Sequence, residues 1–134
     1  MSEPRSIEPV GFSRAKKNTT GAAIPRGSIV AGTDAVDEIK LAESTDIHLG
    51  IASYDIPNGE YGTVQLAGLI PVRVSADVLP NRRLTVDPAN PGQAIEASPA
   101  AGTNVPLVGV SGTAATAGSH CECEQAPPGS SFQG

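Results

Sequence analysis

Glycine and proline recur along this chain at such short intervals that no long regular element fits between them. The sequence has 15 Gly and 12 Pro among 134 residues. Together with Asn they form turn sequences at 57–59, 90–92 and 101–104. The segments between the turns are rich in Val, Ile, Leu and Thr, which favour strands. The sequence therefore predicts an all-β fold of many short strands, either a small barrel or a sandwich.

The strongest strand signals lie at 63–67, 70–74, 84–86 and 105–110. The best candidate for a helix is 34–43, but its apolar residues follow a mixed pattern that fits either a helical turn or a strand. No amphipathic helix is predicted elsewhere. With no Trp, two Tyr and two Phe, the core must be built from aliphatic residues.

The chain also resembles two copies of one pattern, since similar motifs recur in the same order over about 100 residues. Three matched pairs illustrate the repeat: Val30 and Val86, Ile39 and Ile95, and Gly50 and Gly109. Neither half can bury its own apolar face, so we expect the two halves to wrap together into one small barrel that covers most strand edges.

Composition argues against two classes of partner. The net charge of −5 disfavours general nucleic-acid binding. No apolar stretch approaches the length that a membrane helix needs, so no membrane partner is expected. Residues 1–5 lack the pattern of a signal peptide, and we expect the protein to be made in the cytoplasm.

We predict three parts: an extended N-terminal arm at 1–20, a barrel body at 21–124 and a flexible C-terminal tail at 125–134. The arm carries a net charge of +2 before an acidic body. It is either a solvated, disordered terminus or a segment that orders on an acidic neighbour. In the second case its basic and apolar residues are the candidate partner-binding residues: Arg5, Ile7, Val10, Phe12, Arg14, Lys16 and Lys17.

The two cysteines allow a metal or redox hypothesis. Cys121, Cys123 and His120 could supply three zinc ligands, but a structural zinc site needs four. Alternation along a strand would instead point both thiols into the core, with Glu122 and Glu124 facing solvent. We expect the second arrangement, without a metal or another cofactor.

A catalytic site is not expected either. Ser44, His48, Ser53 and Asp55 can be written as a Ser-His-Asp set, but a triad is defined by geometry and no nucleophile elbow is present. We expect His48 to face solvent from a strand. The acidic residues of 34–46 fit a solvated surface better than paired catalytic carboxylates.

Three segments of the first half carry a family resemblance: IPRGSIV at 24–30, LGIA at 49–52 and GEYGTVQLAG at 59–68. Their order resembles the capsid decoration (cement) proteins of tailed bacteriophages. The resemblance extends over about residues 21–124. The second half departs from the family pattern, because Cys-Glu-Cys at 121–123 replaces the usual aliphatic strand.

This resemblance implies a compact barrel of the β-tulip type, commonly a homotrimer or homodimer. It implies a location on the outer surface of the virion head, with the major capsid protein as partner, where the protein stabilises the shell by bridging coat subunits. Two alternatives remain open. One is another virion module, in the tail or baseplate or with a glycan-binding role, and the other is a small metal-binding protein.

Overall fold

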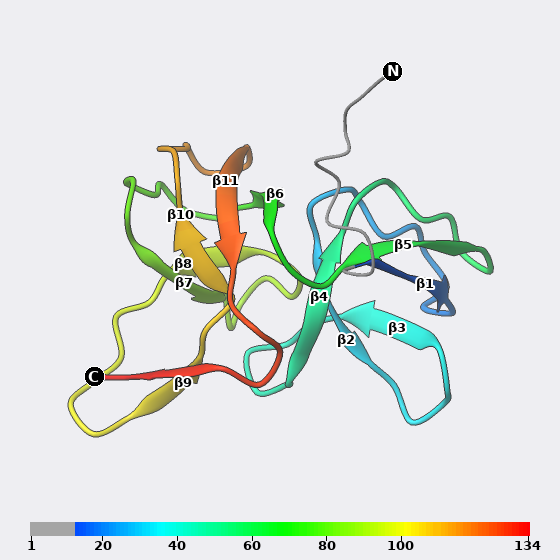
Figure 1. Cartoon of the computed structure of the whole chain (residues 1–134), viewed down its shortest axis with the longest axis horizontal. Helices are drawn as coiled ribbons and strands as arrows, with labels where there is room; N and C mark the ends of the chain where they lie inside the picture. Colours follow the sequence, from blue (N-terminus) through cyan, green and yellow to red (C-terminus); the bar gives the residue numbers. More distant parts are fainter. Residues whose placement is uncertain (1–12) are drawn as a thin grey trace, which may run out of the picture.

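The computed structural model describes residues 13–134, and this part of the chain consists of strands, turns and loops without a helix (Figure 1). It therefore contains no helix that could cross a membrane. The strands are β1 Ser13–Asn18, β2 Ile29–Gly32, β3 Glu38–Leu41, β4 His48–Ala52, β5 Tyr61–Gln65, β6 Leu69–Arg73, β7 Arg83–Val86, β8 Ala94–Glu96, β9 Asn104–Pro106, β10 Gly109–Ser111, β11 His120–Gln125 and β12 Ser131–Gln133. The predicted all-β class is confirmed.

The first half of the chain forms a closed barrel of five strands in the order β1-β3-β2-β4-β5. Strand β1 closes it, pairing parallel with β3 and antiparallel with β5. The barrel encloses an aliphatic core: Ile24, Val30, Ile39, Ala52, Ile56 and Val64. The predicted small barrel is therefore present, and it is built by one half alone.

The second half repeats the strand neighbours of the first. Its sheet has the order β6-β11-β10-β7-β8, in which β6 takes the place of β1 and β11 that of β5. A parallel bridge from Val74 to Ala94 joins the end of β6 to β8, as β1 joins β3. Outside the named strands, the bridge between Ile24 and Ile56 recurs between Val78 and Ala115. The second half thus repeats the strand pairing of the first, as the order of sequence motifs predicted.

The register corrects two of the three matched pairs. Gly50 opposes Val30, and Gly109 opposes Leu84. Gly50 and Gly109 are therefore equivalent as predicted, but Val30 corresponds to Leu84 rather than to Val86. Ile39 likewise corresponds to Ala94, because Ile39 and Ala94 are the residues that β1 and β6 reach by parallel pairing. The spacing between equivalent residues changes along the chain because the connections differ in length.

The two halves do not wrap into one barrel, which corrects the prediction. Instead residues of the first half pack between β6 and β8, the two edge strands of the second-half sheet. The Arg73 N–H donates to the Gly27 carbonyl at 2.9 Å, the Ile29 N–H to the Gly92 carbonyl at 2.8 Å, and the Gly92 N–H to the Ala42 carbonyl at 2.8 Å. Figure 1 shows the halves side by side, with β4 and β6 at the junction.

One core therefore spans the junction. Ile29, Ala31 and Ile51 from the first half join the buried aliphatic residues and both cysteines of the second half. Ile29 and Ile51 are fully buried there. Since each side supplies surface that the other needs, the halves are expected to unfold as a unit.

The segment predicted as a flexible tail is largely part of the fold. Gln125 ends β11, and β12 pairs antiparallel with β9 to form a two-stranded ribbon at the second half (Figure 1). The Arg83 guanidinium lies 4.4 Å from the centroid of the Phe132 ring. The high content of Pro, Gly and Ser in this segment reflects turns between strands rather than an unstructured tail.

The predicted N-terminal arm also ends earlier than expected. Residues 13–18 form β1, whose Ser13–Lys17 pair one by one with residues of β5. The charged residues of this strand interrupt the apolar alternation by which a strand is recognised in a sequence. Arg5, Ile7, Val10 and Phe12 lie outside the described residues, so only an arm up to residue 12 stays a prediction.

Candidate interaction surface

Strand β1 places three of the predicted partner-binding residues, Arg14, Lys16 and Lys17, on the first barrel. Arg14 and Lys16 occupy unusual positions. Their equivalents in the second half are Ile70 and Val72. Arg14 and Ile70 oppose the equivalent residues Val64 and Cys123, and Lys16 and Val72 oppose Gly62 and Cys121.

The second half fills the corresponding positions with aliphatic side chains that are at most 5% exposed. Arg14 and Lys16 of the first half are thus cations at positions whose equivalents in the second half face the interior. Barrel packing does not explain them, which makes β1 a candidate for binding.

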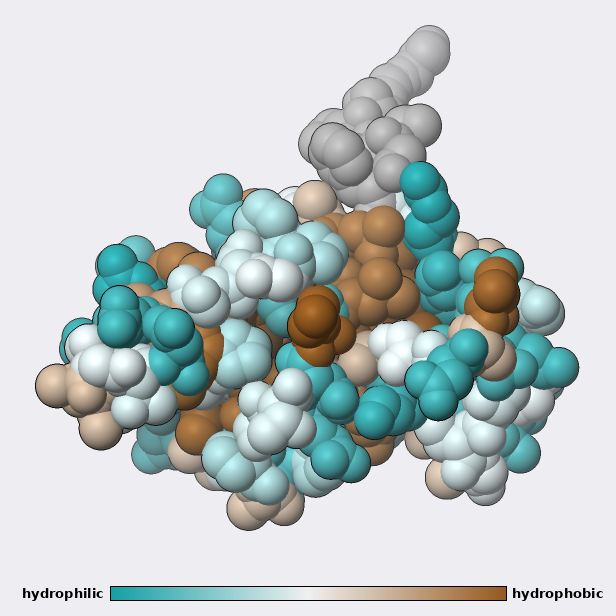
Figure 2. Space-filling view, turned by 90° about the horizontal axis from the view of Figure 1, so that it is seen from below, coloured by the Kyte–Doolittle hydropathy of each residue, from teal (hydrophilic) through white to brown (hydrophobic). Residues whose placement is uncertain are grey.

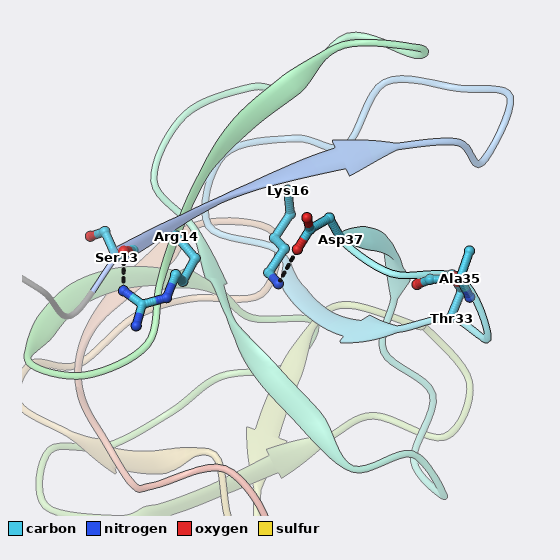
Figure 3. Close-up of polar contacts among 6 residues, drawn as sticks. All are labelled: Ser13, Arg14, Lys16, Thr33, Ala35 and Asp37. Atoms are coloured by element: carbon cyan, nitrogen blue, oxygen red, sulfur yellow. Dashed lines mark hydrogen bonds and ion pairs between the residues drawn. The ribbon is translucent and has the colours of Figure 1, made fainter.

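An ion pair ties this basic strand to the turn between β2 and β3. The Lys16 Nζ lies 3.1 Å from the Asp37 Oδ1, and the Lys17 N–H donates to the Asp37 carbonyl at 2.7 Å. Figure 3 shows Lys16 reaching across to Asp37, with Thr33 and Ala35 farther along the same turn. Because the Asp37 side chain is 54% exposed, the pair adds at most about 1 kcal/mol of stability and mainly orients the turn.

Two large apolar side chains lie in the strands and turn around this ion pair. Tyr61 is 62% exposed and opposes Lys17 across the β1–β5 pair. Val36, which precedes Asp37 in the turn, is 88% exposed. We call Lys17, Val36, Asp37 and Tyr61 the seam surface, in which Lys17 is half-buried and the other three are exposed. It combines apolar contact area with fixed charge, a composition suited to binding protein.

The buried end of β1 is held by a satisfied polar side chain. Asn18 is fully buried. Its Nδ2 donates to the carbonyls of Ala22 and Ile56 at 2.7 and 2.8 Å, and its Oδ1 accepts from the Thr20 N–H at 3.0 Å. These bonds fix the strand end that carries Lys16 and Lys17.

The cysteines lie as predicted on the core side of β11, while Glu122 and Glu124 are exposed. Burial is the main cause that raises the pKa of both thiols, that of Cys123 to about 12. His120 is exposed, and its Nε2 lies 3.2 Å from the Arg26 carbonyl oxygen. Among the described residues no group of His, Cys, Asp and Glu is arranged to hold a metal ion.

The prediction that His48 faces solvent is wrong. The side chain is 2% exposed, at a point where the register between β2 and β4 shifts. Burial lowers its pKa, and a hydrogen bond to the Ala126 backbone opposes that shift. Regular alternation could not reveal this, because a bulge changes which face a residue occupies.

The acidic residues of 34–46 lie mostly on the surface, as expected. Besides the Asp37 pair, Asp46 Oδ2 lies 3.3 Å from Lys40 Nζ and accepts from the Glu43 N–H at 2.9 Å. These contacts stabilise the connection between β3 and β4. Elsewhere, Figure 2 shows apolar surface near the middle of the molecule, with polar surface over most of its two ends.

The fold has a counterpart among solved structures. The crystal structure of the N base of head fiber gp8.5 in bacteriophage phi29 superposes with a TM-score of 0.66, over 85% of this chain and 92% of that chain. The two sequences are 17% identical. Neither the protein-family models nor the curated proteins provided a match. The likeness therefore establishes a shared fold for most of the chain.

Proposed function

We propose that this chain is a decoration protein of a bacteriophage head, which binds the outer surface of the shell and stabilises it by bridging subunits of the major capsid protein. The observation that carries the proposal is the shared fold with a phage head-fiber base over 85% of the chain. The resemblance of residues 21–124 to decoration proteins supports it independently.

The architecture suits a mechanical role. Short strands with tight turns and a core shared by both halves make a stiff body. The thiols are held in the core with raised pKa values, which makes them poor nucleophiles. We therefore propose a binding role in which these thiols take no part as nucleophiles.

The N-terminal segment is the proposed contact with the coat. A segment that orders on docking loses conformational entropy but covers a large surface, and repetition over many sites adds avidity. Because β1 begins at Ser13 and forms five successive residue pairs with β5, a load on residues 1–12 passes directly into the barrel. When β1 is pulled along its length, its hydrogen bonds to β5 share the load.

Co-sedimentation with undecorated heads tests the proposal. The full chain should bind, and a variant lacking residues 1–12 should bind at least about tenfold more weakly while melting at the same temperature. The cut must stop at residue 12, since a longer deletion removes barrel strand β1. Tyr54→Ser, a change at a side chain that is 68% exposed on the body, serves as the control and should bind like the wild type.

Two results would contradict the proposal in different ways. Absence of binding by the full chain would contradict head attachment itself. Equal binding by the shortened and full chains would contradict the arm as the contact and place it on the barrel body.

A fiber base is the second candidate, favoured by the same structural likeness. In that case the chain would anchor a projecting structure rather than bridge coat subunits. Labelled antibodies on virions distinguish the roles: bridging predicts label over the whole head, a fiber base predicts label at the roots of projections, and a tail or baseplate module predicts label away from the head.

A further inference from the structure

The duplication exposes a difference between two equivalent faces. In the first half, Ile29 opposes Ile51 on neighbouring strands, and both side chains are fully buried against the second half. In the second half, the equivalent pair is Arg83 and Val110. Arg83 is exposed and Val110 is 39% exposed. The first-half face that packs against the second half therefore has a partly open equivalent, where the Arg83 guanidinium lies over the Phe132 ring.

The elements that cover the first-half face are also duplicated. Arg73 and Gly92 of the second half bond to this face through their backbones, and His120 contacts it at Arg26. His120 opposes Arg73 as Tyr61 opposes Lys17. Gly92 corresponds to Asp37, because each precedes a residue whose carbonyl accepts a backbone hydrogen bond across the turn. These two residues are Glu38, which accepts from the Thr33 N–H, and Gln93, which accepts from the Asp87 N–H.

The first-half equivalents of the covering elements are thus Lys17, Asp37 and Tyr61, which belong to the seam surface. This surface has the exposed apolar area of Val36 and Tyr61 still available. Each side of the internal contact between the halves therefore has an equivalent surface elsewhere on the molecule that is at least partly exposed.

We propose that the seam surface of one copy docks on the outer face of the second half of another copy. On the receiving face Val110 opposes Glu124, which in turn opposes Leu69, a side chain 60% exposed. Arg83 opposes Val110 on its other side, so the row carries one cation and one anion. The seam surface also carries both signs, and docking would bring Lys17 to Glu124.

The contact joins two different surfaces, so it is heterologous. Such contacts produce closed rings or open chains rather than twofold dimers. Of the two oligomers that the family resemblance implies, this geometry selects the homotrimer over the homodimer.

The contact between copies must be weaker than the internal one. The Lys17 N–H already donates to the Asp37 carbonyl, whereas its equivalent at Arg73 bonds across the internal contact. Asn81 also carries a Cβ where its equivalent, Gly27, leaves room for the His120 ring. The association between copies should therefore rest on side chains and depend on concentration.

Two variants and one mixture test the pairing by analytical ultracentrifugation. Val110→Asp on the receiving face and Tyr61→Asp on the seam surface should each weaken self-association by about tenfold or more, as expected for a central contact residue. Ile47→Asp, an aliphatic side chain 75% exposed outside both surfaces, is the matched control and should associate like the wild type.

The mixture of variants is the decisive experiment. Equal amounts of the Val110→Asp and Tyr61→Asp variants should form a heterodimer, because one intact seam surface can still meet one intact receiving face. Lys17→Glu mixed with Glu124→Lys provides a second pair that leaves the apolar surface unchanged, and this mixture should also associate. Thermal melts confirm that each variant is folded.

Several outcomes would overturn the proposal: a wild type that remains monomeric at millimolar concentration, variants that associate normally, or mixtures in which neither pair associates. Head binding is measured separately. A chain that binds heads but does not self-associate contradicts this contact and leaves the proposed function intact.

Discussion

At the scale of single residues, the departures from the repeat are the most informative. Arg14 and Lys16 stand where the second half has Ile70 and Val72, which identifies β1 as more than a packing element. His48 is unusual for a different reason, because it is a titratable side chain that is buried in the fold.

The buried imidazole predicts a pH dependence of stability. Burial lowers the pKa of His48, so the unfolded chain binds a proton more readily than the folded one. The free energy of unfolding should therefore fall as the pH drops below about 6.5, the pKa of an unperturbed histidine. The carboxylates, including Asp87 with its lowered pKa, contribute only at lower pH.

Urea unfolding at pH 7.5 and pH 5.5 measures this effect. The loss of stability between the two pH values should be smaller in His48→Gln, which removes the titrating group. It should persist in His120→Gln, which changes an exposed histidine. A wild-type stability that stays constant over this interval would contradict a buried neutral His48.

At the scale of elements, strand prediction succeeded where apolar alternation was clean and failed where charge or turn residues hid it. The segments 63–67, 70–74 and 84–86 were recognisable as strands. Strand β1 was hidden by its charges and β12 by the surrounding Pro and Gly. The seam surface also escaped prediction because it joins β1, β5 and the β2–β3 turn, which only the register brings together.

The buried end of β1 offers a direct test of its place in the barrel. Asn18→Ala removes the side chain that satisfies the carbonyls of Ala22 and Ile56, so the free energy of unfolding should fall by roughly 2–3 kcal/mol. Thr19→Ala, at the exposed neighbour, should cost less than about 0.5 kcal/mol. Equal effects in urea unfolding would mean that β1 is not anchored as described.

At the scale of the whole molecule, the repeat was recognisable from the order of motifs, but its assembly was not. Similar motifs cannot show whether two halves wrap into one barrel or stand side by side. The hydrogen bonds of Gly92 and the shared core around Ile51 decide for the second arrangement.

Equivalent positions in the two halves test the shared core. Ile51→Ala should lower the free energy of unfolding by about 2–5 kcal/mol, because a fully buried side chain leaves a cavity. Val110→Ala, at the equivalent and more exposed position, should cost less than about 1 kcal/mol. Both variants should unfold in one transition, and separate transitions for the halves would contradict a common core.

The central claim, attachment to the outside of a phage head, is tested most directly by electron cryomicroscopy of heads that lack the protein, before and after the purified chain is added. The account predicts new density on the outer surface, repeated at equivalent positions where coat subunits meet and matching the two side-by-side halves. Unchanged heads, or density confined to the tail, would contradict it.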